Sequence, residues 1–520
     1  MPDERFDVMV IGGGPNGLTC AAYLARAGAK VVVLDKRFEL GGTMSTDDYS
    51  TPFLYNLCQF ALPLGRDLPP YQDLELERQA IRLMEPDPSL AFVPAGGGEP
   101  LVVRRDGTGL DGRLRELFDA VDQAVLPLLY TAPQPVDEVE QRMSSGNGGG
   151  AALELAKMTP QQLGEAAGDA RARGLLRYLC GLAGFFAPDE PLGLMGAFLV
   201  ARMIRPTIVV GGTKTLALGL FRAGAAAGAQ YRIVSDVDRI DVGGGQVRVA
   251  TRDGREFAGR AVVSTLDPKT TFLDLLDAGV VPEPLRQAAQ AWQFEPAGTF
   301  IGHFGIKGQP PIIGTEQASQ ALLQVVGFAD EAAVARHLEA VSQGRLPEEP
   351  SGHLSVTTRH DPLQAAPGPY GPLHTLRYDT LAPYQPDTGA WDRRRALEYR
   401  NRCWDFLGRQ TAGLAGARLL FSFSDSPLDL ERRFRTAKHG SVRQGALTRG
   451  QTFANRPHPD ASGTRTPIPG VYLGGGGVHP GIPGSLGGGY NAARAICQDL
   501  GLERWWPEPA VRRAPVTAGT

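Results

Sequence analysis

The N-terminal part of the chain alternates between short apolar runs and glycine-rich turns. Residues 6–11 (FDVMVI) form an apolar run that is typical of a strand buried on both faces. Residues 18–27 place Leu and Ala at helical spacing, and Gly28 ends the expected helix. Residues 30–34 (KVVVL) form a second apolar run, which is followed directly by Asp35. This order predicts a strand–helix–strand unit of a parallel sheet.

The turn after the first strand has the spacing Gly-x-Gly-x-x-Gly. In a dinucleotide-binding unit the first glycine permits the tight turn, the second lets a pyrophosphate approach the backbone, and the third lets the helix pack on the strand. The helix N-terminus offers unpaired N–H groups to the phosphates, and the acid after the second strand can accept hydrogen bonds from the ribose. The unit therefore predicts a bound dinucleotide. The residues assigned to it are Gly12, Gly14, Pro15, Asn16, Gly17, Asp35 and Lys36.

The far end of the chain repeats the order of strand, glycine turn and helix. Residues 470–489 contain ten glycines, between the strand-like triplet 471–473 and the helix-forming segment 490–496. A flexible linker has a similar composition, but a linker is seldom framed by a strand and a helix. A helix that begins near Leu486 would direct its N–H groups at an anionic or electron-rich ligand. The glycine density predicts that the backbone closely approaches that ligand.

Composition and charge exclude several classes of protein. Of the 520 residues, 42% are hydrophobic and 21% are charged, which is typical of soluble globular domains. The formal net charge of −3 provides no electropositive field, so no nucleic-acid partner is predicted. The five cysteines are scattered without a Cys-x-x-Cys pair, which excludes a disulfide framework and the usual zinc or iron–sulfur spacings. No metal site is predicted.

Hydropathy bears on where the protein resides. The longest apolar run, residues 191–201, is far shorter than the ~20 residues that span a bilayer. The N-terminus lacks the apolar region and cleavage site of a signal peptide. These features predict a cytoplasmic protein that is at most peripheral to a membrane.

Both glycine-rich regions resemble a known family of flavoproteins. The Gly41-Gly42 pair that follows Asp35 is similar to the second phosphate-contact loop of the family that includes amine oxidases and carotenoid desaturases; that family usually has Arg where this chain has Thr43. Residues 464–470, 472–474, 478–481 and 491–493 resemble the C-terminal signature of phytoene-desaturase-like flavoproteins. The nearest branch contains the relatives of pyridine nucleotide-disulfide oxidoreductase domain-containing protein 2. Looser matches extend the resemblance over most of the chain, at residues 210–213, 235–240, 261–268 and 360–362.

The resemblance implies FAD as the cofactor and a Rossmann-type α/β fold. It also implies that the C-terminal glycine segment runs beside the flavin ring, that Val237 meets the adenine through its backbone, and that Ser264 and Thr265 close the adenine side. The further cofactor residues implied are Gly41, Gly42, Thr43, Met44, Val237, Ser264, Gly476, Pro483 and Leu486.

The motifs divide the chain into a discontinuous FAD-binding domain with two insertions. The FAD-binding domain is predicted to comprise residues 1–75, 206–295 and 455–507. The first insertion, residues 76–205, has apolar helical stretches, and the second, residues 296–454, has strand-like runs between loops rich in Pro and Gly. The strand-like runs are at 299–306, 321–327, 353–358 and 373–379. This pattern fits a helical insertion and a mixed-sheet substrate domain, and residues 508–520 are predicted to be a flexible tail.

Catalytic side chains are not evident from the sequence. It has no His-Glu-x-x-His motif and no Gly-x-Ser-x-Gly elbow. His479 is a weak candidate because it lies in the flavin-adjacent signature, although shaping the turn is the favoured role. Relatives often have a His-Gly pair shortly before the Arg-Pro of residues 456–457. This chain has Gln444 there, which cannot act as an acid or base near neutral pH.

A basic interval lies close to this segment. Residues 431–450 contain six basic residues and one acidic residue. Such a run is most often a solvated face. The alternative is a rim that attracts a carboxylate, a phosphate or an anionic lipid headgroup.

The predicted function is that of an FAD-dependent dehydrogenase or desaturase. It would remove a hydride and a proton from a largely apolar substrate to form a double bond, with the flavin as the reactive group. No second dinucleotide motif in a strand–helix context is present, so oxygen or a quinone is the expected electron acceptor. Two alternatives stay open: an amine or amino-acid oxidase on the same scaffold, and a flavin-retaining interaction protein with little turnover.

Overall fold

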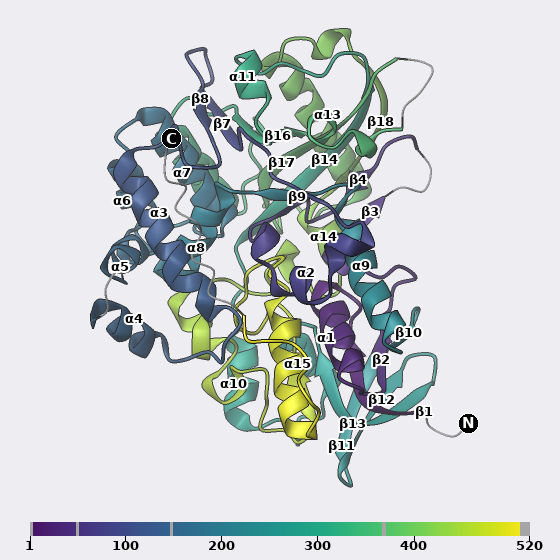
Figure 1. The fold of residues 1–520 in the computed structure, drawn as a ribbon. Coiled ribbons are helices and arrows are strands. Elements are labelled where there is room, and N and C mark those ends of the chain that lie inside the picture. Colours follow the sequence, from purple (N-terminus) through teal and green to yellow (C-terminus); the bar gives the residue numbers. More distant parts are fainter. Residues whose placement is uncertain (1–3, 48–50, 146–148, 367–370, 510–520) are drawn as a thin grey trace.

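Two seven-stranded sheets organise the protein (Figure 1). The computed structural model describes residues 4–47, 51–145, 149–366 and 371–509. The first sheet contains the N-terminal strand, and the second lies at the opposite end of the molecule. Residues 510–520 of the predicted tail are outside the described residues.

The first sheet is mostly parallel, and three segments of the chain contribute to it. Its order is β10-β2-β1-β13-β12-β11, with β19 beside β13; β10, β2, β1, β13 and β19 run parallel. The strands are β1 (Glu4–Ile11), β2 (Val31–Leu34), β10 (Gln230–Arg232), β11 (Val237–Gly243), β12 (Gln246–Thr251), β13 (Glu256–Ser264) and β19 (Val471–Leu473). The predicted α/β Rossmann-type class is confirmed.

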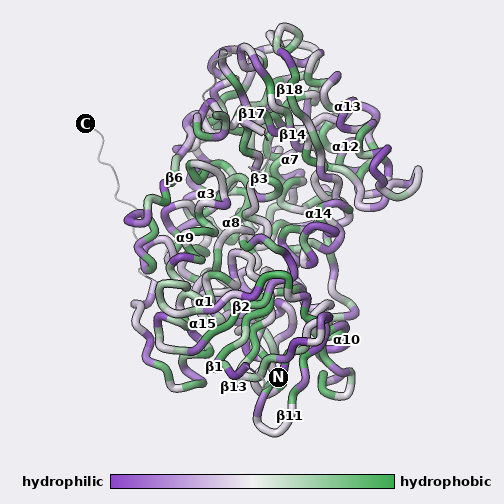
Figure 2. The backbone as a smooth tube through the Cα atoms, turned by 90° about the vertical axis from the view of Figure 1, so that its right-hand side faces the viewer, coloured by the Kyte–Doolittle hydropathy of each residue, from purple (hydrophilic) through white to green (hydrophobic). Residues whose placement is uncertain are grey.

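Both faces of this sheet are buried at β1 and β2, as the continuous apolar runs predict, whereas β11 and β12 alternate between buried and exposed residues. Val8 and Val10 of β1 pack in one core cluster with α1 (Pro15–Arg26) and α15 (Gly487–Leu500). Met9 and Ile11 point to the other face, where they join a cluster that includes α10 (Glu283–Ala291). The apolar residues of β1 and β13 are visible in Figure 2.

Four parallel strands end at the same level. Ile11 at the end of β1 pairs with Leu34 of β2 and with Ser264 of β13, and Ser264 pairs with Leu473 of β19. In open parallel sheets, ligands bind in the crevice beyond the carboxyl ends of the strands. The register therefore predicts a ligand-binding site at this edge of the sheet.

The second sheet is mixed and has the order β18-β14-β17-β16-β15-β7-β8. Its strands are β7 (Leu90–Val93), β8 (Leu101–Val103), β14 (Ala297–Lys307), β15 (Leu323–Val326), β16 (Gly352–Val356), β17 (Leu373–Pro383) and β18 (Arg418–Asp425). The sequence analysis missed β18, and β7 and β8 lie in an interval for which it predicted only helices. Apolar runs of three or four residues do not distinguish a strand from a helix by periodicity, and β7 is a strand because it pairs with the distant β15.

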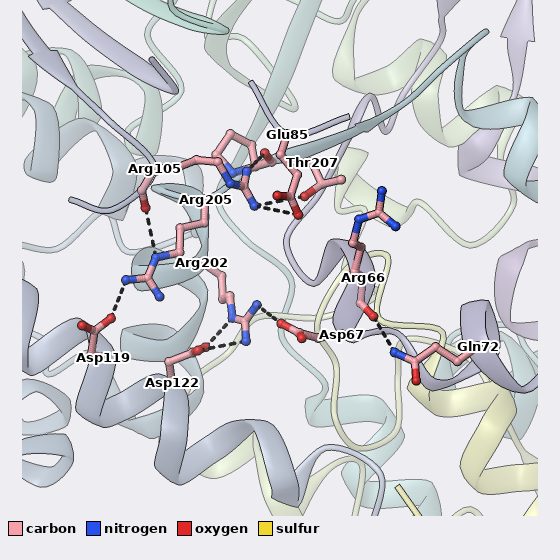
Figure 3. A network of polar contacts seen from close by, with 11 residues as sticks. Arg66, Asp67, Gln72, Glu85, Arg105, Asp119, Asp122, Arg202, Arg205 and Thr207 are labelled. Atoms are coloured by element: carbon pink, nitrogen blue, oxygen red, sulfur yellow. Dashed lines mark hydrogen bonds and ion pairs between the residues drawn. The ribbon is translucent and has the colours of Figure 1, made fainter. Parts of the chain in front are cut away.

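A block of helices lies beside the second sheet (Figure 1). It consists of α3 (Gly112–Val125), α4 (Val136–Ser145), α5 (Gly149–Lys157), α6 (Pro160–Ala166), α7 (Ala170–Leu182) and α8 (Gly193–Met203). Figure 3 shows how Arg202 of α8 connects this block to the short 3-10 helix Gly65–Asp67. Its guanidinium donates to Asp122 of α3 and, over 2.6 Å, to Asp67.

Smaller elements include the sheets β3-β4 and β5-β9-β6, and the short helices α2 (Pro69–Asp73) and α11 (Glu316–Ser319). The strands of the small sheets are β3 (Thr46–Asp47), β4 (Tyr55–Asn56), β5 (Ala61–Leu62), β6 (Leu83–Met84) and β9 (Thr207–Val209). Among the longer helices, α9 (Thr213–Ala226) packs beside α1, and α12 (Glu331–Ser342), α13 (Arg393–Gln410) and α14 (Pro427–Arg433) lie near the second sheet. Within the described ranges, no helix has both the length and the apolar composition needed to cross a bilayer.

Candidate active site

A cavity with an empty volume of about 1070 Å³ opens at the ends of the parallel strands. Ile11 of β1 and Leu34 of β2 contribute to its wall, and so does Thr265, the residue after β13. The first glycine turn and the C-terminal glycine segment both line it, although they lie at opposite ends of the chain. We refer to it as the dinucleotide cavity.

Most of the residues predicted to bind the cofactor line this cavity. They are Gly12, Gly14, Pro15, Asn16, Asp35, Lys36, Gly42, Thr43, Val237, Gly476, Pro483 and Leu486. The remaining four, Gly17, Gly41, Met44 and Ser264, are not among its lining residues. Of the predicted pair Ser264 and Thr265, only Thr265 lines the cavity, and the Ser264 hydroxyl is buried 2.7 Å from that of Thr271. Cofactor binding by these residues stays a prediction.

The glycines of the first turn have different structural roles. A Cβ at Gly17 would lie 1.9 Å from the carbonyl oxygen of Gly12, so this glycine is needed for α1 to pack on the turn. A Cβ at Gly14 would meet only the Cα of Gly42, at 3.9 Å. Gly14 therefore leaves open space at the N-terminus of α1, where a phosphate can reach the backbone N–H groups.

Asp35 holds the glycine turn in place. Its Oδ2 accepts from the Gly13 N–H over 2.6 Å, and its Oδ1 accepts from the Arg37 N–H over 2.8 Å. Burial raises the pKa of Asp35, while these two backbone hydrogen bonds oppose the increase. The sequence analysis assigned Asp35 only to the ribose. Each carboxylate oxygen can accept a second hydrogen bond, so the side chain can serve both partners.

The C-terminal glycines pack against the protein itself. The Gly489 N–H donates to Asn16 Oδ1 over 3.2 Å, and a Cβ at Gly489 would lie 1.9 Å from the Asn16 carbonyl oxygen. A Cβ at Gly488 would lie 2.2 Å from the carbonyl oxygen of Gly475. Gly489 thus allows α15 to contact the first glycine turn, and Gly488 allows it to pack on the segment at Gly474 and Gly475, whereas both were expected from the sequence to approach a ligand. Leu486, the residue before α15, does line the cavity.

Gln444 and His479 are both structural in this arrangement. Gln444 donates to the Thr265 carbonyl over 3.1 Å and accepts from the Gly477 N–H over 3.0 Å, so it bridges two walls of the cavity. His479 does not line the dinucleotide cavity; its Nε2 is 2.9 Å from the Leu128 carbonyl oxygen, and its ring stacks on Phe453. Burial lowers the pKa of His479 to about 4. Its predicted role in shaping the turn stays a prediction.

The basic interval 431–450 is largely paired with acids. Arg433 contacts Asp425 at 2.6 Å, and Arg449 contacts Asp137 at 2.5 Å. Two of its arginines line the dinucleotide cavity, and each of them is paired as well. Arg435 contacts Asp236 at 3.0 Å, and Arg443 contacts Glu295 at 2.5 Å.

A second cavity, with an empty volume of about 1250 Å³, adjoins the first. The two share five lining residues, namely Gln59, Ser441, Val442, Arg443 and Pro483. The second sheet, helices α7 and α8 and the segment 58–63 form most of its other walls, with apolar side chains such as Phe60, Leu179, Leu199, Ile301 and Leu381. We refer to it as the apolar cavity. Sequence reasoning could not locate it, because its walls come from segments that meet only in the folded chain.

Comparisons with known proteins agree with this architecture. Residues 10–66 match the family described as NAD(P)-binding Rossmann-like domain. The matches together fit the superfamily of flavin-dependent desaturases and amine oxidases, which confirms the predicted resemblance, and the chain is a flavin-type oxidoreductase.

Individual relatives are similar along their whole length. One of the subunits of limonene dehydrogenase from Castellaniella defragrans is 29% identical, with 97% of each chain covered. Pyridine nucleotide-disulfide oxidoreductase domain-containing protein 2 of Mus musculus, from the predicted branch, is 24% identical over 95% of this chain and 94% of its own. Hydroxyneurosporene desaturase of Cereibacter sphaeroides is 26% identical over 95% of this chain and 98% of its own. Among solved structures, cyclohexylamine oxidase from Brevibacterium oxydans has a TM-score of 0.61 at 17% identity, covering 96% of this chain and 100% of its own, and so shares the fold.

Proposed function

We propose that the protein is an FAD-dependent oxidoreductase that removes a hydride and a proton from a largely apolar substrate to form a double bond. The observation that carries this proposal is the shared wall of the two cavities. One cavity has the features of a dinucleotide site, and the other is lined mainly by apolar side chains. A substrate in the apolar cavity would thus meet a cofactor at the shared residues.

The residues of the dinucleotide cavity fit FAD in particular. Gly14 and the N-terminus of α1 would hold the pyrophosphate, Asp35 the adenosine ribose, and the backbone of Val237 the adenine. Gly476, Pro483 and Leu486 would hold the flavin end. FAD, when bound, supplies a two-electron acceptor for a hydride. The proposed final electron acceptor is oxygen or a quinone.

The domain division supports the same proposal. All strands of the first sheet come from residues 1–75, 206–295 and 455–507, the three segments that we propose as the FAD-binding domain. Most strands of the second sheet come from residues 296–454, the proposed substrate domain.

An apolar substrate fits the cavity better than an amine does. Two carboxylates line the apolar cavity in the described part of the chain, Glu295 and Asp379, and each is paired with an arginine. A cationic amine would therefore lose its hydration without gaining a free carboxylate. The names of limonene dehydrogenase and hydroxyneurosporene desaturase also support the proposal, whereas the fold shared with cyclohexylamine oxidase keeps amine oxidation as the second candidate.

Anaerobic mixing of the FAD-loaded protein with candidate substrates tests the proposal. Apolar alkenes and alcohols should bleach the flavin absorbance, and amines should not. Bleaching by amines alone would favour the oxidase, and no bleaching by either class would favour the interaction protein. Ala61→Phe is the matched control, because Ala61 lines the apolar cavity but not the dinucleotide cavity. This variant should retain FAD and lose the bleaching.

A further inference from the structure

A cluster of polar side chains lies on the wall of the apolar cavity formed by the second sheet. His353 of β16 lines the cavity together with Arg377 and Asp379 of β17. His353 pairs with Asp379 across the two strands, and Arg377 lies two residues from Asp379, so all three share one face of the sheet. Each is at most 5% exposed. Buried polar groups of this kind normally have hydrogen-bond partners.

Two members of the cluster satisfy each other. The Arg377 guanidinium donates twice to the Asp379 carboxylate, over 2.8 Å in both cases, and once to the Asn56 carbonyl over 2.8 Å. It also lies over the ring of Phe60, 4.6 Å from its centroid. The pair is therefore rigid, and it fixes the position of the Asp379 oxygens.

His353 is only half satisfied. Its Nδ1 is 2.9 Å from the hydroxyl oxygen of Tyr178, but its buried Nε2 has no hydrogen-bond partner. The nearest carboxylate oxygen, Asp379 Oδ2, is 3.7 Å from Nε2, which is too far for a hydrogen bond. A buried polar group without a hydrogen bond costs free energy, so an atom of a ligand that bonded to Nε2 would be stabilised there.

The partner of Nδ1 determines which ring nitrogen carries the proton. Burial lowers the pKa of His353 to about 4, so the ring is neutral near pH 7. If Tyr178 donates to Nδ1, its hydroxyl proton is satisfied and the ring proton is on Nε2; the other tautomer leaves two buried groups unsatisfied. Nε2 is therefore a donor, and the Asp379 carboxylate beside it is an acceptor.

We propose that His353 and Asp379 together bind a hydroxyl group of the substrate, which makes the substrate an apolar alcohol. Because Nε2 and Oδ2 are 3.7 Å apart, a single oxygen atom about 2.8 Å from each would bridge them, accepting from the first and donating to the second. A carbonyl could only accept, an ammonium could only donate, and a hydrocarbon would leave Nε2 unsatisfied. The inference rests on the proposed function, in which the apolar cavity receives the substrate.

Binding of three probes of one shape to the FAD-loaded protein tests this inference. Menthol both donates and accepts, its methyl ether only accepts, and p-menthane does neither. Dissociation constants are measured by calorimetry and by perturbation of the flavin spectrum. His353→Phe should weaken menthol binding about tenfold and leave p-menthane binding unchanged or stronger. The ether should bind the wild-type protein more weakly than menthol, because it cannot donate to Asp379.

Two further variants separate a binding role from a packing role. His353→Gln places an amide N–H near the position of Nε2 and should restore part of the menthol affinity. Thr299→Val removes a hydroxyl from the same cavity wall and should change the affinities for alcohol and hydrocarbon equally. Flavin content and thermal unfolding verify that each variant is folded.

The possible results separate this inference from the proposed function. If His353→Phe weakens menthol and p-menthane by the same factor, the hydroxyl site is wrong and the apolar cavity stands. The hydroxyl site is also wrong if the wild-type protein binds menthol no tighter than its ether. In that case a bound water, and not the substrate, would occupy the position between His353 Nε2 and Asp379 Oδ2. If His353→Phe does not fold, the wild-type comparison of menthol with its ether decides alone. If no probe binds, both the inference and the proposed substrate cavity are wrong.

Discussion

Replacing Gly14 by Val should abolish cofactor binding while leaving the fold of the protein intact. Gly14 has an extended backbone conformation that any residue can adopt, with φ of −77°. A Cβ there would meet only the Cα of Gly42, at an ordinary contact distance of 3.9 Å. The space that the Val side chain would fill is part of the dinucleotide cavity, in front of the α1 N-terminus. A pyrophosphate could then no longer reach the backbone.

The expected effect of Gly14→Val on the free energy of unfolding differs between the apoprotein and the FAD-loaded protein. Gly14 is the N-cap of α1, and its replacement by an apolar residue should lower the free energy of unfolding of the apoprotein by about 0.5–1 kcal/mol. FAD at a hundred times its dissociation constant adds about 2.7 kcal/mol to the wild-type protein and nothing to a variant that cannot bind it. With saturating FAD, the two proteins should therefore differ by about 3–4 kcal/mol.

Flavin content of the purified proteins and urea unfolding with and without FAD provide the measurements. Gly17→Ala is the control for a steric effect on the protein itself, because its Cβ would lie 1.9 Å from the Gly12 carbonyl oxygen. It should destabilise the apoprotein by more than Gly14→Val does. A Gly14→Val protein that retains one flavin per chain with an unchanged visible spectrum would refute the placement of the pyrophosphate.

Three further substitutions test other parts of the structure. Asp35→Ala should weaken FAD binding by about tenfold to a hundredfold in titrations of the apoproteins, and equal affinities would remove Asp35 from the site. Because the pKa of His479 is about 4 in the folded state, below its ordinary value of 6.5, the unfolded chain binds the proton more readily. This group should thus lower the free energy of unfolding by about 1.4 kcal/mol per pH unit as the pH falls from 6.5 toward 4, and His479→Gln should show a shallower slope in urea titrations. Asp122→Ala removes one of the two partners of Arg202 and should lower the free energy of unfolding by about 2 kcal/mol. A urea denaturation midpoint equal to that of the wild-type protein would contradict this prediction.

The parts of the fold that depend on local sequence could be predicted well. The triplet 471–473 is β19, and the apolar runs at residues 6–11 and 30–34 correspond to β1 and β2 within two residues at each end. These segments have strong periodicity and clear glycine boundaries, which are local signals.

Features that depend on contacts between distant segments could not be predicted. The pairing of β7 with β15 and the approach of Gly489 to Asn16 join segments that are far apart in the sequence. The glycine density near residue 488 was correctly associated with close backbone approach, but the sequence could not show that the approaching group is the protein's own backbone. Likewise, no local pattern in the sequence indicates that Arg377 and Asp379 of β17 form an ion pair beside His353.

The path of the chain through the cofactor site has a consequence for biosynthesis. Asn16 emerges from the ribosome early, but its partner Gly489 follows only after about 470 further residues, roughly 24–95 s later at ~5–20 residues per second. During the first half of this interval, before β13 has been synthesised, β1 also exposes one free strand edge, which is the kind of surface that chaperones protect. The nascent chain therefore has the first glycine turn without α15, the helix that contacts it. The wall of the dinucleotide cavity that Leu486 completes, immediately before α15, is also absent from any translation product that stops short of this residue.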